Sequence, residues 1–339
     1  MRIFALGLAA VLTIAAGLGA NDSRAATTLR LTYDRPVDAT LAPFLLAAAK
    51  GFFRDEGLTV TTDIAKSTKD AITRVAAGET DFALADINAL ARHRDTDNGS
   101  AVKAVFVMFN RAPYAVVARK SRGVNALADV QGKILGVPDN DLSIRFWPAV
   151  AKLNGIKPDK VKIEKIGLAV REPMLSAGQV DAVTGFSYLA PLNMRDRGIP
   201  DSDLAVFRLS DYGSEAYGAA LIVSPKFAAA QPDAVRGFLR AVIAGLKLTA
   251  QDPARATDDV MAQIDGGNRD LEFERLRLVL RDNLITSEVK RNGFGGIDDK
   301  RFARALAQLA EDHKFKKTLS AADLFDASYL PPPASRIPD

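Results

Sequence analysis

The segment AGETDFA at residues 77–83 has a counterpart, AGQVDAV at residues 177–183, one hundred positions further along the chain. Each segment follows a short helical pattern and leads into an apolar run. A glycine at the end of a helix adopts the left-handed conformation that closes it, and the following aspartate begins a short buried strand. This repeated helix-to-strand joint predicts two similar α/β units, and two such units with a cleft between them form a clamp for a ligand.

The first residues have the features of a secretory signal peptide. Arg2 supplies a short basic region, residues 3–18 are apolar, and Ser23-Arg24-Ala25 fits the small-x-small rule for cleavage. The alternative, a membrane anchor, is disfavoured because the apolar run is shorter than the ~20 residues that a membrane span needs. We therefore predict a signal peptide at residues 1–25 and a soluble protein in a bacterial periplasm.

The composition is that of a large globular protein. The chain has 339 residues and no cysteine, which excludes disulfides and thiolate metal sites but suits a periplasmic protein with a large core. After cleavage it is long enough for two domains of roughly 100–200 residues. The net charge is +4, and basic residues are interleaved with acidic ones, so we expect no nucleic-acid partner.

Strands and helices alternate through the first two thirds of the chain, which predicts a doubly wound sheet in each unit. The expected strands are residues 29–33, 58–64, 81–85, 102–109, 114–118, 133–137, 161–165, 181–184 and 219–223; the expected helices between them are residues 43–51, 69–77, 87–94, 142–154, 171–177 and 188–195. Further helices are expected at residues 234–249, 254–263, 271–283 and 300–312, packed on the first unit. The proline-rich tail, residues 331–339, is expected to be an extended end.

The segment AKGFFRDEGLTV at residues 49–60 resembles the "AxxKGFFxxEGLxV" segment of the periplasmic substrate-binding proteins of ABC importers for nitrate, sulfonates, taurine and thiamine-pyrimidine precursors (the SsuA/THI5-like family). More of the family pattern follows in order, at residues 75–81, 127–137, 153–161 and 177–182. The resemblance covers roughly residues 29–223 and is specific as a set.

The resemblance implies the α/β fold of a type II periplasmic binding protein, with two doubly wound lobes and a helical C-terminal extension. Lobe 1 would be discontinuous, at residues 27–111 and 218–330, and lobe 2 would be residues 112–217. The ligand of such a protein sits between the lobes, and the closed form docks transiently on an ABC permease in the inner membrane. We expect this chain to act in that way, as a monomer.

Ligands of open α/β sheets bind at the carboxyl ends of the strands, and that rule selects polar and aromatic residues here. The candidate ligand-binding residues are Tyr33, Asp34, Asp86, Asn110, Asp139, Asn140, Asp141, Arg145, Phe186, Ser187, Tyr188 and Tyr212. Asp86 and Asp141 could equally cap the helices that follow them. Phe186 and Tyr188 have the alternative of being core aromatics.

The candidate set is acidic and aromatic. Carboxylates accept hydrogen bonds from amino groups, and rings offer stacking faces. We therefore favour a flat, nitrogen-bearing, neutral or cationic ligand such as an aminopyrimidine or another thiamine precursor. Arg145 keeps an anion open as the alternative, such as a sulfonate, nitrate or an aromatic acid, because anion sites use arginines and helix starts.

An enzyme is the competing class. Fungal pyrimidine-precursor synthases are similar within the same resemblance, and their chemistry is expected to need a histidine in the cleft and a Cys-rich segment. This chain has no cysteine, and its two histidines, His93 and His313, are both expected to be exposed. It also has no Walker loop, G-x-S-x-G, H-E-x-x-H or GxGxxG motif. We therefore expect a binding protein rather than an enzyme, with no cofactor and no metal.

Overall fold

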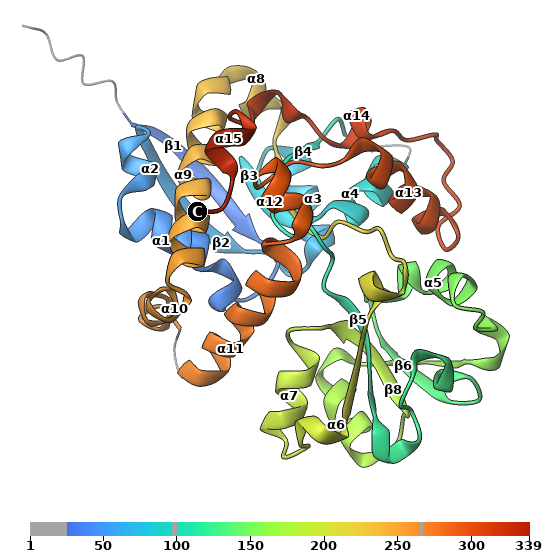
Figure 1. Cartoon of the computed structure of the whole chain (residues 1–339). Helices are drawn as coiled ribbons and strands as arrows, with labels where there is room; N and C mark the ends of the chain where they lie inside the picture. Colours follow the sequence, from blue (N-terminus) through green and yellow to red (C-terminus); the bar gives the residue numbers. More distant parts are fainter. Residues whose placement is uncertain (1–25, 97–99, 265–266) are drawn as a thin grey trace, which may run out of the picture.

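A computed structural model describes residues 26–339 with the exception of residues 97–99 and 265–266. The predicted signal peptide, residues 1–25, lies outside the described residues. Within the described part, two mixed sheets flanked by helices form two lobes (Figure 1). No helix in that part is long and apolar enough to cross a membrane.

The two sheets share one topology. Lobe 1 has the strand order β2-β1-β3-β10-β4, and lobe 2 has the order β7-β6-β8-β5-β9. The strands of lobe 1 are β1 (Thr27–Tyr33), β2 (Leu58–Ile64), β3 (Phe82–Asp86), β4 (Lys103–Val107) and β10 (Ala219–Val223); those of lobe 2 are β5 (Tyr114–Arg119), β6 (Ile134–Pro138), β7 (Lys162–Ile166), β8 (Ala182–Phe186) and β9 (Leu204–Arg208). The first three strands of each order are parallel, and the fourth runs antiparallel to both of its neighbours. The predicted pair of α/β units is therefore confirmed.

The repeated helix-to-strand joint has the same geometry in both lobes. Gly78 and Gly178 each have a φ of 73°, the left-handed conformation that closes the preceding helix. Asp81 and Asp181 each accept a hydrogen bond, at 2.8 Å in both lobes, from a backbone N–H of the neighbouring parallel strand. The aspartate thus ties the start of β3 to β1 and the start of β8 to β6, which explains why the two segments look alike.

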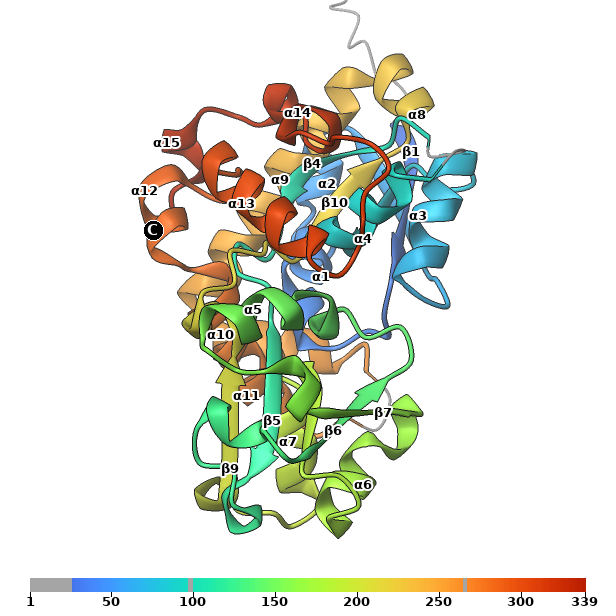
Figure 2. The same ribbon diagram turned by 90° about the vertical axis from the view of Figure 1, so that its right-hand side faces the viewer.

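The helices cover both faces of the sheets, and the late ones gather on lobe 1 (Figures 1 and 2). The helices are α1 (Ala42–Ala49), α2 (Phe52–Asp55), α3 (Thr68–Ala77), α4 (Ile87–Arg94), α5 (Trp147–Leu153), α6 (Arg171–Ala177), α7 (Ala190–Asp196), α8 (Pro225–Ala230), α9 (Pro232–Gln251), α10 (Pro253–Met261), α11 (Arg269–Val279), α12 (Ser287–Asn292), α13 (Asp299–Ala310), α14 (Ala321–Leu324) and α15 (Pro333–Arg336). Helix α9 packs along α1, and its apolar face shares one buried core with β1, β3 and β10. A π-helical turn (Leu280–Leu284) continues α11.

Two segments cross between the lobes side by side. Residues 108–113 lead from β4 to β5, and residues 209–218 lead from β9 back to β10. The Gly218 N–H donates to the Phe109 carbonyl at 2.9 Å, and the Ala112 N–H donates to the Ala216 carbonyl at 3.0 Å. Because these bonds hold the crossings together, the lobes are joined by one two-stranded connection.

The C-terminal tail differs from the expectation of an extended end. Arg336 is buried and donates hydrogen bonds to the carbonyls of Pro331 and Phe294. Asp339 forms an ion pair with Lys247 of α9 at 3.0 Å. A guanidinium with several carbonyl acceptors thus anchors the tail on lobe 1. The short edge strand β9 is a second feature that the sequence pattern did not predict.

Candidate ligand-binding site

Five aromatic rings form a continuous row between the lobes. Phe109 contacts Tyr188 at a centroid distance of 6.2 Å, and Tyr188 contacts Phe186 at 5.7 Å. Phe186 in turn lies 6.3 Å from Tyr114, which packs on Phe146 at 5.5 Å. Phe109 comes from a crossing segment and the other four from lobe 2, where Phe186 ends β8 and Tyr114 begins β5. We call this set the ring row.

A buried carboxylate of lobe 1 contacts the ring row at Tyr114. The Tyr114 hydroxyl donates to Asp86 at 2.6 Å. Asp86 also caps α4, because it accepts from the N–H groups of Asn88 at 2.8 Å and Ala89 at 3.1 Å. Burial raises the pKa of Asp86, and burial together with the Asp86 charge raises that of Tyr114. Asp86 therefore both caps a helix and contacts the opposite lobe.

A second carboxylate of lobe 1 acts on the ring row at Tyr188. Asp34 accepts from the Arg35 Nε at 2.8 Å and from the Thr68 hydroxyl. The Arg35 Nη1 donates to the Tyr188 hydroxyl at 3.2 Å, and its guanidinium lies over the Phe109 ring at 5.7 Å. Burial raises the pKa of Tyr188 to about 12, although the Arg35 charge opposes this shift. Lobe 1 thus contacts the row at both Tyr114 and Tyr188.

Asp141 belongs to the same region from the side of lobe 2. It accepts from the Ile144 N–H at 2.9 Å, and burial raises the pKa of its carboxyl group. Its charge also acts on Tyr114, while the Asp34 charge acts on Asp86. The structure therefore brings together Asp34, Asp86, Asp141 and the predicted rings Phe186 and Tyr188.

A buried ion pair in lobe 2 was missed by the sequence analysis. Arg171 and Glu172 are only 4% and 6% exposed, and the Arg171 Nε donates to Glu172 at 3.0 Å. The Arg171 guanidinium lies over Gly185 of β8, where the Cβ of any larger residue would approach its Nη1 to 2.8 Å. The Asn193 amide also donates to Glu172, at 3.2 Å. The strand-end rule, applied to β7, would have selected this pair.

Tyr33 and Tyr212 lie outside this cluster of rings and carboxylates. Tyr33 is in the core of lobe 1 and packs edge-on against Phe44 at 5.8 Å. Tyr212 packs edge-on against Phe207 at 6.0 Å, at the end of the short 3-10 helix that follows β9. A strand end thus predicts the edge of the sheet but not the face on which a ring packs.

Asn110 is occupied within the connection between the lobes. Its amide group donates to Glu288 at 2.9 Å and accepts from the Thr286 hydroxyl at 2.6 Å. Arg301 of α13 donates to its side chain and to its carbonyl, at 3.2 and 2.8 Å. These contacts fix the crossing segment on the late helices.

The remaining candidates lie at the surface or on the backbone turn before α7. Asp139 and Asn140 are exposed, and Asn140 has a φ of 61° in a turn after β6. Ser187 is buried and donates its N–H to the Pro113 carbonyl at 2.7 Å. Arg145 faces lobe 1 and is described next.

Ion pairs join the lobes along one edge, where α13 lies over α5 (Figures 1 and 2). The Arg145 Nη1 donates to Asp312 at 3.1 Å, and the Lys152 Nζ donates to Glu311 at 3.0 Å. Both carboxylates directly follow α13 of lobe 1, and both cations belong to lobe 2. We call these two pairs the α13 edge.

A second edge joins α11 to α7 (Figure 1). Arg195 binds Glu274 through two bonds of 2.6 and 2.8 Å. Arg208 and Asp282 form a further pair at 3.4 Å. The α11 edge and the α13 edge hold the lobes together on either side of the two crossings.

Both histidines are half-buried, so the expectation of exposed histidines is wrong. The His313 Nε2 lies 3.0 Å from Asp95, which also accepts from the N–H groups of Lys316 and Lys317. The His93 Nε2 is buried without a hydrogen-bond partner among the described residues. The helical pattern did not predict that the segment after α13 folds back over α4.

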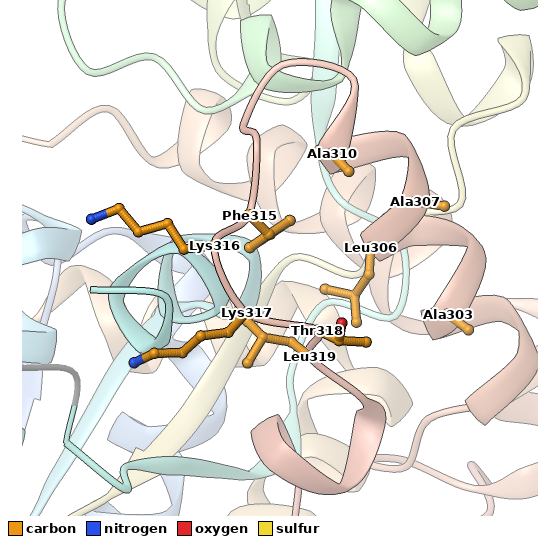
Figure 3. A pocket seen from close by; sticks show the side chains of 9 residues that line it. All are labelled: Ala303, Leu306, Ala307, Ala310, Phe315, Lys316, Lys317, Thr318 and Leu319. Atoms are coloured by element: carbon orange, nitrogen blue, oxygen red, sulfur yellow. The ribbon is translucent and has the colours of Figure 1, made fainter. Parts of the chain in front are cut away.

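Shallow hollows lie on the outside of lobe 1 along α13, with volumes of about 370 and 450 Å³. Figure 3 shows the first: Leu306, Phe315 and Leu319 lie between the helix and the segment that follows it, while Lys316 and Lys317 point away from the helix. Neither hollow contains a residue of the ring row. The predicted site and these hollows are therefore separate features.

The fold is that of the two-lobed α/β binding proteins. The periplasmic aliphatic sulphonate binding protein SsuA from Escherichia coli is similar, with a TM-score of 0.69 and 13% identity over 87% of this chain and 91% of that one. A zinc-bound ligand-binding component of an ABC-type import system from Staphylococcus aureus has a TM-score of 0.66 and 13% identity over 89% of this chain and 97% of that one. At such identities the likeness shows the fold alone.

The family follows from the sequence. The model of the family described as NMT1/THI5 like matches residues 38–256, which is more than half of the chain. The chain therefore belongs to the NMT1/THI5-like family, and the predicted relationship to SsuA/THI5-like binding proteins is confirmed.

Curated relatives include binding proteins and enzymes. The riboflavin-binding protein RibY of Chloroflexus aurantiacus is 27% identical over 74% of this chain and 70% of that protein. The formylaminopyrimidine-binding protein of Halalkalibacterium halodurans is 22% identical over 91% and 92% of the two chains. The 4-amino-5-hydroxymethyl-2-methylpyrimidine phosphate synthase of Legionella pneumophila is 25% identical over 63% of this chain and 66% of that protein.

Proposed function

We propose that this protein is the solute-binding component of an ABC importer and that it binds a flat, nitrogen-bearing ligand, such as an aminopyrimidine, between its lobes. The observation that carries the proposal is the ring row, which Asp86 contacts at Tyr114 and which Asp34 reaches at Tyr188 through Arg35. Rings stack on flat ligands, and carboxylates accept hydrogen bonds from ring amino groups. The names of the riboflavin-binding and formylaminopyrimidine-binding relatives, which refer to flat nitrogen heterocycles, support this ligand class.

The rings are largely buried in this conformation, with Tyr188 and Tyr114 at 2% and 1% exposure. A ligand therefore reaches them only when the lobes separate, and it contacts both lobes only when they close again. Such a ligand shifts the population toward the closed state by its differential affinity for that state. This behaviour suits a carrier that signals its loaded state to a permease.

We further propose that residues 27–111 with 218–330 and residues 112–217 move as the two bodies. The mature protein would begin after residue 25 and work in the periplasm, as a monomer that docks transiently on its permease. A hinge at the two segments that cross between the lobes is supported by their backbone hydrogen bonds, Ala112 to Ala216 and Gly218 to Phe109.

The proposal includes the absence of catalysis. The synthase relatives are the reason to test this. The chain has no cysteine, and His313 is engaged by Asp95. Peptide mass spectrometry of the purified protein should find every histidine-containing peptide at its unmodified mass; loss of a histidine ring would favour the synthase.

Thermal-shift screening tests the ligand class. Aminopyrimidines should raise the melting temperature, and alkanesulfonates, nitrate and aromatic acids should raise it less. A ligand at a hundred times its Kd adds about 2.7 kcal/mol to the free energy of unfolding. Asp86→Asn should abolish the shift, whereas Asp159→Asn, which removes an equal charge from an exposed turn, should not. Stabilisation by the acids alone would overturn the proposed ligand class.

A further inference from the structure

Two arginines from opposite lobes lie beside the Tyr114–Phe146 end of the ring row. Arg92 belongs to α4, the helix that Asp86 caps, and it is half-buried. Arg145 directly precedes Phe146, the ring that packs on Tyr114. Asn88, one helical turn before Arg92 on α4, donates its amide to the Tyr114 hydroxyl at 3.0 Å. The charges that act on Arg92 include those of Arg145, Asp312, Asp86 and Tyr114. The two guanidinium groups therefore adjoin the proposed ligand site.

Neither arginine is fully satisfied by the protein. Arg92 is half-buried, and among the described residues the charges of Asp312 and Asp86 act on it without a direct hydrogen bond or ion pair. Arg145 donates from its Nη1 to Asp312, but its buried Nε has no partner in the described part of the chain. Burial lowers the pKa of Arg92, and the charge of Arg145 lowers it further. The two cations therefore repel each other across the lobes, and the charges of Asp312, which pairs with Arg145, and of Asp86 offset part of that repulsion; a further anion bound between the guanidinium groups would offset more of it.

We propose that Arg92 and Arg145 form an anion subsite across the lobes, so that the ligand is a flat nitrogenous ring that also carries an acidic group such as a phosphate or carboxylate. This inference rests on the proposed function for the ring of the ligand, and it adds an acidic group to that ligand. The acid binds both guanidinium groups through charge-assisted hydrogen bonds. It replaces Asp312 on Arg145, so the subsite is complete only when the lobes are closed.

The competing explanation is that Arg145 and Asp312 are only an ion pair that holds the lobes together. The two explanations predict opposite signs. If the pair acts alone, Asp312→Asn weakens closure and every ligand, and Arg92→Gln is neutral or favourable because it removes a repulsion. If an anion binds there, Asp312→Asn strengthens anion binding because it removes a competitor, and Arg92→Gln weakens it.

The first experiment uses inorganic phosphate as the probe, against chloride at constant ionic strength. Phosphate should raise the melting temperature of the wild-type protein and of Arg255→Gln, a matched change at an exposed arginine of α10. It should raise that of Arg92→Gln and Arg145→Gln much less. An equal shift in all four proteins would overturn the subsite. This readout does not depend on whether the ring is an aminopyrimidine.

The second experiment measures the Kd of 4-amino-5-hydroxymethyl-2-methylpyrimidine and of its phosphate ester by calorimetry. The ester should bind at least tenfold more tightly than the alcohol, since a charge-assisted hydrogen bond contributes roughly a factor of ten to a hundred. Arg92→Gln should remove that preference. Lys152→Gln, which breaks the other ion pair of the α13 edge, should weaken alcohol and ester by the same factor.

The outcomes separate the two proposals. Equal affinity for alcohol and ester, or an ester preference that Arg92→Gln retains, overturns the subsite and leaves the proposed ring site standing. A phosphate shift that requires Arg92, with no binding of either pyrimidine, supports the subsite and counts against the aminopyrimidine.

Discussion

The two lobes have the same frame but contribute different chemistry. Both have one strand order, a closing glycine at φ 73° and an aspartate that ties two parallel strands. At the ends of the strands they diverge: lobe 1 presents Asp34 and Asp86, whereas lobe 2 presents most of the ring row. The frame is therefore repeated in the two lobes, whereas the carboxylates and rings of the candidate site are divided between them.

The largest expected effect tests whether the carboxylate of lobe 1 and the carboxylate of lobe 2 have different roles. Asp86→Ala removes a helix cap and leaves the buried Tyr114 hydroxyl without its acceptor, so it should lower the free energy of unfolding by about 2–4 kcal/mol. Asp141→Ala removes the bond to the Ile144 N–H together with the contacts of this carboxyl group to Thr184 and Ser143, and should cost about 1–2 kcal/mol, less than Asp86→Ala. Urea unfolding measures both. Equal losses would mean that the two carboxylates have equivalent roles.

The next effect tests whether the helix-to-strand joints of the two lobes are equivalent. Asp81→Ala and Asp181→Ala each remove a 2.8 Å bond between a carboxylate and a strand N–H. Because both groups are partly exposed, each loss should be about 1–2 kcal/mol and the same in both lobes. Unfolding of the two variants under identical conditions provides the measurement. A difference of more than about 1 kcal/mol would break the equivalence of the joints.

A pH series sharpens the assignment of Asp86. Its folded-state pKa is raised by burial, so the folded state binds this proton more tightly than the unfolded state does. The contribution of Asp86 to stability is therefore greatest below the unfolded pKa of about 4, and it falls as the pH rises through the raised folded value. Asp86→Asn retains the cap but cannot ionise. The stability of this variant relative to the wild type should rise between pH 3 and pH 7; a constant difference would contradict the buried charge.

The smallest effect concerns the two edges that join the lobes. Glu274→Ala breaks the bidentate ion pair with Arg195. Because both side chains of this pair are about one third exposed, the free energy of closure should weaken by well under 1 kcal/mol. Single-molecule FRET between the lobes measures this change. Added salt should shrink the difference between variant and wild type, because exposed charges are screened. A shift that grows with salt would rule out an ion pair.

Local chemistry predicted the frame of the two lobes, whereas the ligand-binding role of the candidate residues stays a prediction. The Gly78 and Gly178 joints are readable because a left-handed glycine and a strand-tying aspartate act within a few residues. The strand-end rule selected Asp86 and Tyr188, and the structure shows that both make contacts across the lobes. It also selected Tyr212 and Asn110, whose packing partners Phe207 and Glu288 come from other elements.

The features that sequence reasoning missed depend on long-range contacts. The sequence pattern places Arg92 on the exposed face of α4. In the folded protein, this face meets the opposite lobe. Arg336 anchors the tail through carbonyls that the sequence does not show. Phe294 lies 42 residues before Arg336 in the chain, so no local pattern reports this contact.

Native mass spectrometry of the protein purified from the cells that produce it naturally tests the central claim most directly. The account predicts that the wild-type protein retains a small molecule whose mass fits a nitrogen heterocycle. It also predicts that Asp86→Asn, folded and purified in the same way, retains none. A retained alkanesulfonate, or a heterocycle that Asp86→Asn holds equally well, would contradict the claim that lobe 1 carboxylates and lobe 2 rings grip the ligand together.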